Sequence, residues 1–272
     1  MTTLTLHAPG KVNLCLFVGQ PREDGYHPLV SVFQSVSLAD ELTLEAAPKD
    51  AAADQVRCPG VDGKNLAATA LAAYRAASGW DAPPVRLTII KRIPVAAGMG
   101  GGSADAAAAL KLAAQAAGRP DDPLISAIAP SLGADVPFAL HNGRALVTGI
   151  GERVEPLPAA PAAALVLLPS VHTLSTPAVY AEADRLGATR ADLAPAEAGV
   201  RAGSVPAVND LQPAAISLCP DIDRELDRLH AAGAAHVMVS GSGPTVFGVF
   251  DDPERARANT RDIPGALIVE PV

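Results

Sequence analysis

Hydrophobic and polar positions alternate in some stretches of the chain and follow the helical period in others. Thr3–His7 alternates as a half-buried strand does, whereas Asn65–Ser78 places its large apolar residues at helical spacing before Gly79, a suitable stop. The same criteria predict strands at Val12–Val18, Val30–Val36, Glu41–Ala46, Val85–Ile90, Arg144–Thr148, Ala164–Leu168, His236–Ser240 and Thr245–Phe250, and helices at Ser103–Ala117, Leu124–Leu132, Pro177–Leu186 and Asp221–Ala232, before a terminal helix–strand pair. Strands and helices intermix without strict regularity, which predicts an α+β fold with a mixed or antiparallel sheet.

The length of 272 residues suits one large domain or two modest ones. The segment Pro156–Pro161 is rich in proline and alanine and is the candidate boundary. We therefore expect an N-terminal domain over 1–157 and a C-terminal domain over 158–272.

Composition narrows the class of protein. Hydrophobic residues make up 49% of the chain and charged residues 18%, so a core can be buried. The net charge of −8 argues against nucleic-acid or anionic-membrane partners, although a local cluster of amides can still bind phosphate. Cys15, Cys58 and Cys219 show no disulfide or metal spacing, and no signal peptide or membrane span is evident, so we expect a cytoplasmic protein without a metal site built from its own residues.

A glycine-rich stretch between a predicted strand and a predicted helix carries the strongest chemical signal. Four glycines in the five residues from Gly98 to Gly102 let the backbone approach a ligand closely, and the following helix start adds free amides and a positive dipole end. Such an arrangement favours a polyphosphate. Ser103 is suited to cap the helix or to offer its hydroxyl to phosphate or magnesium. The candidate nucleotide-binding residues are Pro94, Val95, Ala96, Ala97, Gly98, Met99, Gly100, Gly101, Gly102, Ser103 and Ala104.

Two other glycine motifs fail on spacing. A dinucleotide fingerprint counted from Gly98 needs glycine or alanine where Ser103 stands, and a P-loop needs Gly-Lys-Ser/Thr where this chain has Gly-Ser-Ala. A flexible turn that caps a helix stays open as an alternative.

Three separated segments resemble the signatures of the GHMP kinase superfamily, which includes galactokinase, homoserine, mevalonate and phosphomevalonate kinases. They are Ala8–Leu14, Pro94–Asp105 and Val239–Phe247, in the family's order. The resemblance implies a two-domain GHMP-kinase-like fold, an active site in the cleft between the domains, and ATP with Mg²⁺. Met99 and Ala104 stand where many relatives carry Leu and Ser, which leaves Ser103 as the side-chain oxygen of that segment.

A second set of segments indicates which small molecule accepts the phosphate. Asp24–His27, Gly133–Phe138, Gly149–Glu152 and Asn209–Leu211 resemble the branch of the superfamily that acts on a cytidine diphosphate-linked methylerythritol. The resemblance implies that ATP phosphorylates the 2-hydroxyl of this small molecule. We expect the protein to be a monomer or a weak homodimer.

Aromatic residues are the candidates for binding the cytosine base. Tyr26 is suited to stack on a pyrimidine and His27 to hydrogen-bond its edge, and Tyr180 aligns with a family position that is often aromatic. The alternatives are that Tyr26 packs under its loop, His27 is solvated and Tyr180 belongs to the core.

The resemblance assigns Asp135 as the catalytic base. Asp135 follows Gly133 in a predicted loop, where we expect Pro137 to hold Val136 extended. Without the resemblance, a loop aspartate is usually a turn residue or a helix cap.

The resemblance also places Lys11 beside the base, where it would keep the carboxylate ionised and stabilise charge on the reacting oxygen. Lys11 follows a predicted Pro-Gly turn, and the alternative is a solvated lysine at a strand end. Asn13, on the same strand face, is suited to orient the substrate hydroxyl. Ser240 and Gly241 of the third signature are expected to support the glycine loop near the substrate, although a tight β-connection explains them equally well.

Three other functions compete. Another kinase of the superfamily, of the homoserine or mevalonate type, is disfavoured by Asp24–His27. A non-catalytic nucleotide-binding protein on the same fold would have lost Lys11 or Asp135, and both are present. A dinucleotide-dependent oxidoreductase is disfavoured by the failed glycine spacing.

Overall fold

The structure is a computed structural model that describes residues 2–61, 63–159 and 163–272. The chain forms two compact units, and each is assembled from several segments. Unit 1 comprises Met1–Gly10, Leu38–Val95 and Gly100–His141, and unit 2 comprises Lys11–Ser37, Ala96–Met99 and Asn142–Val272. The continuous domains 1–157 and 158–272 expected from the sequence stay a prediction, and residues 160 and 161 of the proposed boundary segment lie outside the described residues.

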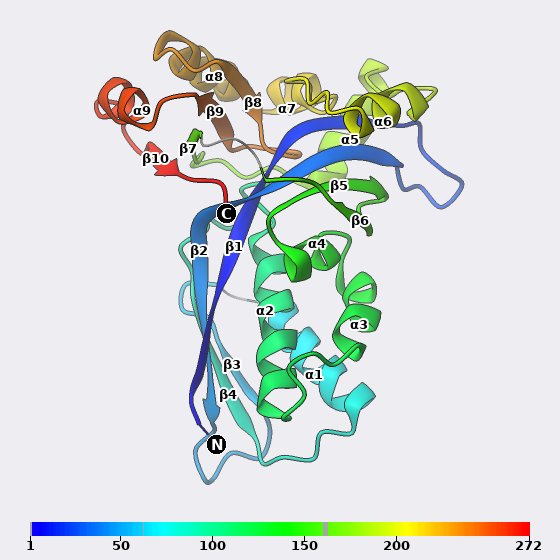
Figure 1. The fold of residues 1–272 in the computed structure, drawn as a ribbon, viewed down its shortest axis with the longest axis vertical. Helices are drawn as coiled ribbons and strands as arrows, with labels where there is room; N and C mark the ends of the chain where they lie inside the picture. The colour runs from blue at the N-terminus through cyan, green and yellow to red at the C-terminus, as the bar shows by residue number, and fades with distance from the viewer. Residues whose placement is uncertain (1, 62, 160–162) are drawn as a thin grey trace. The chain divides into compact units, whose positions relative to one another are not determined.

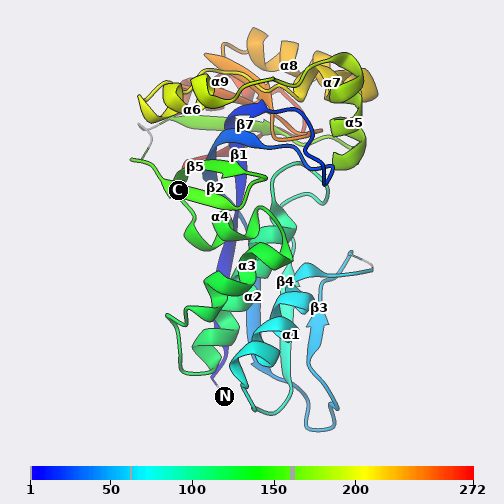
Figure 2. The same ribbon diagram turned by 90° about the vertical axis from the view of Figure 1, so that its right-hand side faces the viewer.

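Unit 1 contains strands against which two long helices run (Figure 2). β1 (Leu4–Val18) begins in it and β2 (Leu29–Ala46) ends in it; the other elements are β3 (Gln55–Arg57), β4 (Val85–Ile90), α1 (Leu66–Ser78), α2 (Gly101–Ala116), α3 (Leu124–Leu132) and α4 (Val136–His141). β2 and β4 are antiparallel, with Leu42 opposite Ile89, and β3 and β4 are parallel.

The core of unit 1 is built largely on alanine. The buried face of α2 includes Ala106, Ala107, Ala109 and Ala113, and α1 packs beside it. Small side chains let two helix axes approach closely, which explains how a chain with few aromatic residues fills this core.

Unit 2 holds a second sheet covered by helices (Figure 1). Its elements are β5 (Arg144–Gly149), β6 (Arg153–Pro156), β7 (Ala164–Leu168), β8 (His236–Val239), β9 (Val246–Phe250), β10 (Leu267–Val269), α5 (Thr176–Leu186), α6 (Ala194–Arg201), α7 (Gln212–Leu218), α8 (Asp221–Ala231) and α9 (Pro253–Thr260). The strand order β10-β7-β9-β8 is antiparallel throughout, and α8 and α9 pack on this sheet. The first half of β2 pairs with β5, and β5 pairs with β6.

Two strand breaks expected from the sequence are wrong. β1 continues through Pro9 and Gly10, where a turn was predicted. Among the named strands β1 pairs only with β2, and an edge strand tolerates a proline that cannot donate to the ladder. β2 likewise continues through Asp40, because that buried carboxylate accepts hydrogen bonds from the backbone N–H groups of Arg92 and Ile93.

The helix expectations are mostly confirmed, with three helices missed. Asn65 caps α1 by accepting from the N–H of Ala67 at 2.9 Å, and Gly79 ends the helix with φ +64°. The sequence did not reveal α4, α6 or α7, each of which has a proline in its first turn, where no N–H is needed. The expected α+β class is confirmed. Among the helices of the described residues, none is long and apolar enough to cross a membrane.

Candidate active site

Lys11 lies within β1 rather than after a turn or at a strand end. Its side chain is buried, its N–H donates to the carbonyl of Met99 at 2.9 Å, and its Nζ donates to Oδ1 of Asn13 at 2.8 Å. The Nζ also lies 4.5 Å from the centroid of the Phe33 ring. These contacts hold a cation at a fixed place next to the glycine loop.

Ser31 fixes how Asn13 is oriented. Nδ2 of Asn13 donates to Oγ of Ser31 at 2.9 Å, and that hydroxyl donates to the carbonyl of Cys15. Because a carbonyl only accepts, the hydroxyl hydrogen points at Cys15 and the lone pair faces Asn13. The amide of Asn13 must therefore turn its oxygen toward Lys11.

The third signature segment packs directly against the glycine loop. Oγ of Ser240 donates to the carbonyl of Gly98 at 3.1 Å. Gly98 has φ +73°, and a Cβ there would collide with the carbonyl of Ser240 and lie 2.9 Å from that of Gly243. A Cβ on Gly241 would lie 3.5 Å from Nζ of Lys11. Residues of all three signature segments therefore meet within unit 2. The third segment is also a tight connection between the antiparallel strands β8 and β9, so that alternative describes its local structure correctly, and its expected role near the substrate stays a prediction.

The side chain of Asn209 holds the third signature segment in place. Its Nδ2 donates to the carbonyls of Val239 at 2.9 Å and Gly241 at 2.8 Å, and its Oδ1 accepts from the N–H of Leu211. The side chain is buried, so these bonds replace water that the loop carbonyls cannot reach.

The helix after the glycine loop begins two residues earlier than expected. α2 starts at Gly101 behind Gly100, whose φ of +68° sets the turn, and Ser103 makes no capping bond. The expected cap is wrong because Ser103 already lies inside the helix. The first N–H groups of α2 have no partner within the helix, which suits an anion, and phosphate binding here stays a prediction.

A buried ionic cluster in unit 1 ties both ends of the glycine loop. Nζ of Lys91 contacts Oδ2 of Asp40 and donates to Oδ2 of Asp105 at 2.8 Å. Asp40 holds the segment before the loop, because it accepts hydrogen bonds from the N–H groups of Arg92 and Ile93. Asp105 lies after the loop, on α2. Burial raises the pKa of the Asp105 carboxyl to about 6, against the opposing effect of Lys91.

Asp135 sits in a turn directly before α4. Its carbonyl accepts the N–H of Ala139 at 3.0 Å, and Val136 is helical, so the expected extended conformation before Pro137 is wrong. Proline at the second helical position lacks only an N–H that the helix does not use. A Cβ built on Gly133 would lie 4.0 Å from Oγ of Ser103, which places the first turn of α2 beside this turn. Asp135 belongs to unit 1 and Lys11 to unit 2, and their expected pairing stays a prediction.

The loop that carries Tyr26 and His27 is internally hydrogen-bonded. The N–H of Arg22 donates to the carbonyl of Tyr26 at 2.8 Å, and Oδ1 of Asp24 accepts the N–H of Tyr26 at 3.1 Å. Tyr26 is 60% exposed and His27 only 8%. Both alternatives from the sequence are therefore wrong, because the tyrosine does not pack under its loop and the histidine is not solvated.

His27 meets α5, where Tyr180 lies. Its Nδ1 is 2.9 Å from the carbonyl of Gly19, and its Nε2 is 3.3 Å from Oδ2 of Asp184. The rings of His27 and Tyr180 have centroids 5.0 Å apart. The structure thus brings two of the three expected base-binding residues together and adds Asp184, which the sequence did not reveal.

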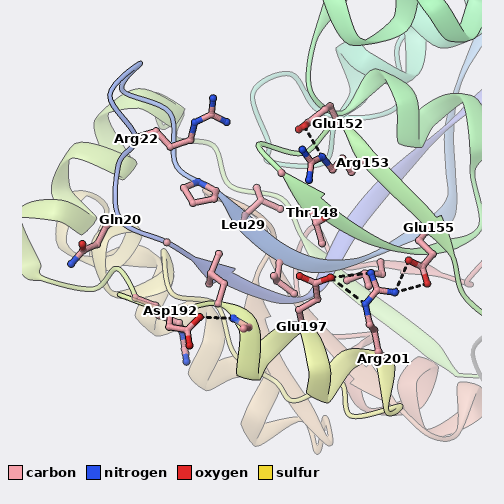
Figure 3. A pocket seen from close by; sticks show the side chains of 18 of the residues that line it. Gln20, Arg22, Leu29, Thr148, Glu152, Arg153, Glu155, Asp192, Glu197 and Arg201 are labelled. Atoms are coloured by element: carbon pink, nitrogen blue, oxygen red, sulfur yellow. Dashed lines mark hydrogen bonds and ion pairs between the residues drawn. The ribbon is translucent and has the colours of Figure 1, made fainter.

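Unit 2 also contains a pocket of about 740 Å³ that none of the expected site residues line. Figure 3 shows its charged side chains paired with one another: Arg201 contacts Glu155 at 2.6 Å and Glu197 at 2.9 Å. Oε2 of Glu152 accepts the N–H of Ile150 at 2.7 Å. These charges satisfy each other, so we assign no ligand to this pocket. Among the residues that the structure describes, no group of three or more His, Cys, Asp or Glu is placed to hold a metal.

Comparison with known proteins decides the family. A family model for the GHMP kinases N terminal domain matches residues 65–143, and one for GHMP kinases C terminal matches 187–264. A Nocardioides protein named 4-diphosphocytidyl-2-C-methyl-D-erythritol kinase is 42% identical over 281 residues, covering 96% of this chain and 93% of that protein. The chain belongs to the 4-diphosphocytidyl-2-C-methyl-D-erythritol kinase family.

Two further relatives agree over almost the full length. A kinase of the same name from Streptomyces coelicolor is 44% identical, covering 97% of this chain and 92% of its own. A crystal structure of a 4-(cytidine 5'-diphospho)-2C-methyl-D-erythritol kinase matches with a TM-score of 0.80 and 37% identity, covering 98% of each chain. The GHMP kinase fold expected from the three signatures is confirmed.

Ser31 and Asp40 are residues that sequence reasoning passed over. Ser31 lies inside a predicted strand and Asp40 directly before another, and both side chains are fully buried. A polar side chain in a buried strand must find a partner. The sequence can therefore point to such residues, but it does not show which hydrogen-bond partner each one has.

Proposed function

We propose that the protein transfers the γ-phosphate of ATP to the 2-hydroxyl of 4-diphosphocytidyl-2-C-methyl-D-erythritol, a step of non-mevalonate isoprenoid precursor biosynthesis. The observation that carries the proposal is the meeting of Lys11 and Asn13 with Gly98 and Gly241 in unit 2. It places a buried cation beside a backbone cradle, which is what phosphoryl transfer requires of a protein.

ATP is the donor in this proposal, and the glycine loop binds its phosphates. Gly98 and Gly100 have positive φ, so the chain between them turns tightly where a side chain would block a close approach. The first amides of α2 point the same way as its positive dipole end. Pro94 to Ala104 are the proposed nucleotide-binding residues, with Ser240 as a support of the loop.

Asp135 is the proposed base. It takes the proton of the 2-hydroxyl while that oxygen bonds to the γ-phosphorus, and the bond from phosphorus to the bridging oxygen breaks to release ADP. Lys11 stabilises negative charge on the reacting oxygens. Asn13 keeps Lys11 in place through its 2.8 Å bond, and its remaining amide hydrogen is suited to the acceptor.

Magnesium fits this set of residues through Ser103 and the nucleotide phosphates. Mg²⁺ generally keeps several waters and binds substrate phosphates rather than a cage of side chains, and the hydroxyl of Ser103 is a hard oxygen donor. When bound, the ion neutralises charge on the transferring phosphate.

The test follows ADP release with ATP and Mg²⁺ and one acceptor at a time. We expect turnover with the cytidyl alcohol and none with homoserine or mevalonate. Phosphorus NMR of the product should show a new monoester on the methylerythritol. Turnover of homoserine or mevalonate without the cytidyl alcohol would overturn the proposal in favour of another GHMP kinase activity, and no turnover at all would favour a nucleotide-binding role.

We also propose a cytoplasmic monomer or weak homodimer with no nucleic-acid partner. The net charge of −8 disfavours a polyanion partner, and all three cysteines are free.

A further inference from the structure

Helix α5 presents two different chemical groups to the same imidazole. Tyr180 and Asp184 are four residues apart, so they lie on one face of the helix. The Tyr180 ring lies 5.0 Å from the His27 ring, and Oδ2 of Asp184 lies 3.3 Å from Nε2 of His27. The helix thus offers an aromatic surface and a carboxylate at one place.

His27 is held so that only one ring edge faces Asp184. The carbonyl of Gly19 only accepts, so Nδ1 is the donor in the 2.9 Å bond and Nε2 faces the carboxylate. Gly19 is itself fixed, because its N–H donates to the carbonyl of Pro28 at 2.8 Å. Asp184 has a side chain 37% exposed, against 6% for His27, so the carboxylate is the partner that an incoming ligand can reach.

We propose that Asp184 determines base specificity by accepting a hydrogen bond from the exocyclic amine of cytosine. The inference rests on the proposed function, since it assumes a cytidyl acceptor near Tyr26 and His27. An ionised carboxylate can only accept. Cytosine carries an amine donor at the position where uracil carries a carbonyl oxygen. Asp184 therefore attracts cytosine and repels uracil, which gives selection by both contact and repulsion.

Glu182 on the same helix provides a matched control. Its carboxylate is bound by Arg185 at 2.7 Å and by the hydroxyl of Ser217, and it does not contact His27. Glu182→Gln and Asp184→Asn both remove one negative charge from α5 at nearly constant volume. Only the second replaces an oxygen of the carboxylate that faces the imidazole with an amide NH2 group, so the side chain no longer only accepts.

The test measures binding of CDP and of UDP by calorimetry, with the donor site saturated with ADP. We expect the wild-type protein and Glu182→Gln to prefer CDP by roughly 10- to 100-fold. Asp184→Asn should bring the two affinities within about threefold, because a carboxamide both donates and accepts. Thermal melts of the three proteins show whether any change comes from misfolding.

A second measurement separates this inference from the reaction on which it rests. The ratio of kcat/KM for cytidyl- and uridyl-linked methylerythritol should fall about tenfold in Asp184→Asn and stay constant in Glu182→Gln. Equal wild-type binding of CDP and UDP, or an unchanged preference in a folded Asp184→Asn, overturns the role of Asp184. A CDP preference that Asp184→Asn abolishes, without ADP release on the cytidyl alcohol, supports the role of Asp184 and overturns the proposed reaction.

Discussion

At the scale of single residues, a buried hydroxyl outside every motif controls the lysine expected to act in catalysis. Ser31 accepts from Asn13 and donates to Cys15, and Asn13 in turn accepts from Lys11. This chain of bonds has one consistent direction, set by the carbonyl at its end. Ser31 and the carbonyl of Cys15 therefore set the orientation of the Asn13 amide.

Ser31→Ala should lower kcat by about tenfold, the equivalent of roughly 1.4 kcal/mol and close to one hydrogen bond, while KM for ATP changes little. The amide of Asn13 is then free to turn its nitrogen toward Lys11. Steady-state kinetics of Ser31→Ala against Ser31→Thr, which keeps the hydroxyl, measure the effect. Equal kcat in all three proteins contradicts the role of Ser31. Ser131→Ala is the control, because that exposed hydroxyl bonds only to the carbonyl of Ile128 in its own helix.

Asp135→Ala should lower kcat at least ~100-fold with ATP binding retained, because a positioned base contributes about 10²–10⁴-fold. Single-turnover kinetics and nucleotide binding by calorimetry test the two halves separately. Asp121→Ala, an exposed aspartate in unit 1, should behave as wild type. Near-wild-type turnover in Asp135→Ala would show that another group accepts the proton.

At the scale of elements, the glycine loop depends on its contact with the loop that follows β8. Gly98→Ala should weaken nucleotide binding by at least about tenfold, because left-handed φ costs roughly 1–2 kcal/mol without glycine and the new Cβ meets the carbonyl of Ser240. Gly118→Ala is the control: its φ is +72°, against +73° for Gly98, and nothing lies within 4 Å of its Cβ. Equal nucleotide affinity in both variants would mean that the contact with Ser240 does not shape the loop.

The cluster of Lys91, Asp40 and Asp105 makes unit 1 sensitive to pH. The pKa of Asp105 is raised from 3.8 to about 6, so the folded protein binds this proton more tightly than the unfolded chain. Its stabilising contribution is fully present below about pH 3.8 and is lost as pH rises through about 6. The unfolding free energy of wild type minus that of Asp105→Asn should therefore fall between about pH 4 and pH 7. Urea titrations across this range measure it, and a difference that rises with pH contradicts the raised pKa.

At the scale of the whole molecule, residues far apart in sequence form single structural features. Asn209 holds Val239 and Gly241, and the neighbouring Asp210 accepts the N–H of Val18 and pairs with Arg190 at 2.6 Å. Asp210 joins segments that lie 192 residues apart, and the adjacent Asn209 joins segments 30 residues apart.

Asn209→Ala should lower the free energy of unfolding by about 3 kcal/mol, because it removes three buried hydrogen bonds worth roughly 1 kcal/mol each. Asn259→Ala is the control, since its exposed amide makes one bond, to Ala232 at 2.8 Å, and should cost less than about 1 kcal/mol. Chemical denaturation of both variants tests the difference. Equal losses of unfolding free energy would mean that other contacts hold the third signature segment.

The sequence alone determined most of the local elements and predicted the class of ligand. Helical spacing with Asn65 and Gly79 at its ends predicted α1 correctly, and the glycine spacing pointed to polyphosphate rather than a dinucleotide. These signals are local, because caps, turns and periodicity depend on neighbours a few residues away. The same locality explains the errors at Asp40 and Val136, where distant hydrogen bonds and the position of a proline in a helix decided the conformation.

Only the tertiary structure decided which side chains act on one another. No spacing rule connects Ser31 with Asn13, Asp184 with His27, or Asn209 with Gly241, since each pair lies on different elements. Burial makes these partners obligatory, because a polar group removed from water must find its hydrogen bonds within the protein. The sequence indicates which side chains are candidates for binding and catalysis, and the fold sets how those side chains are oriented.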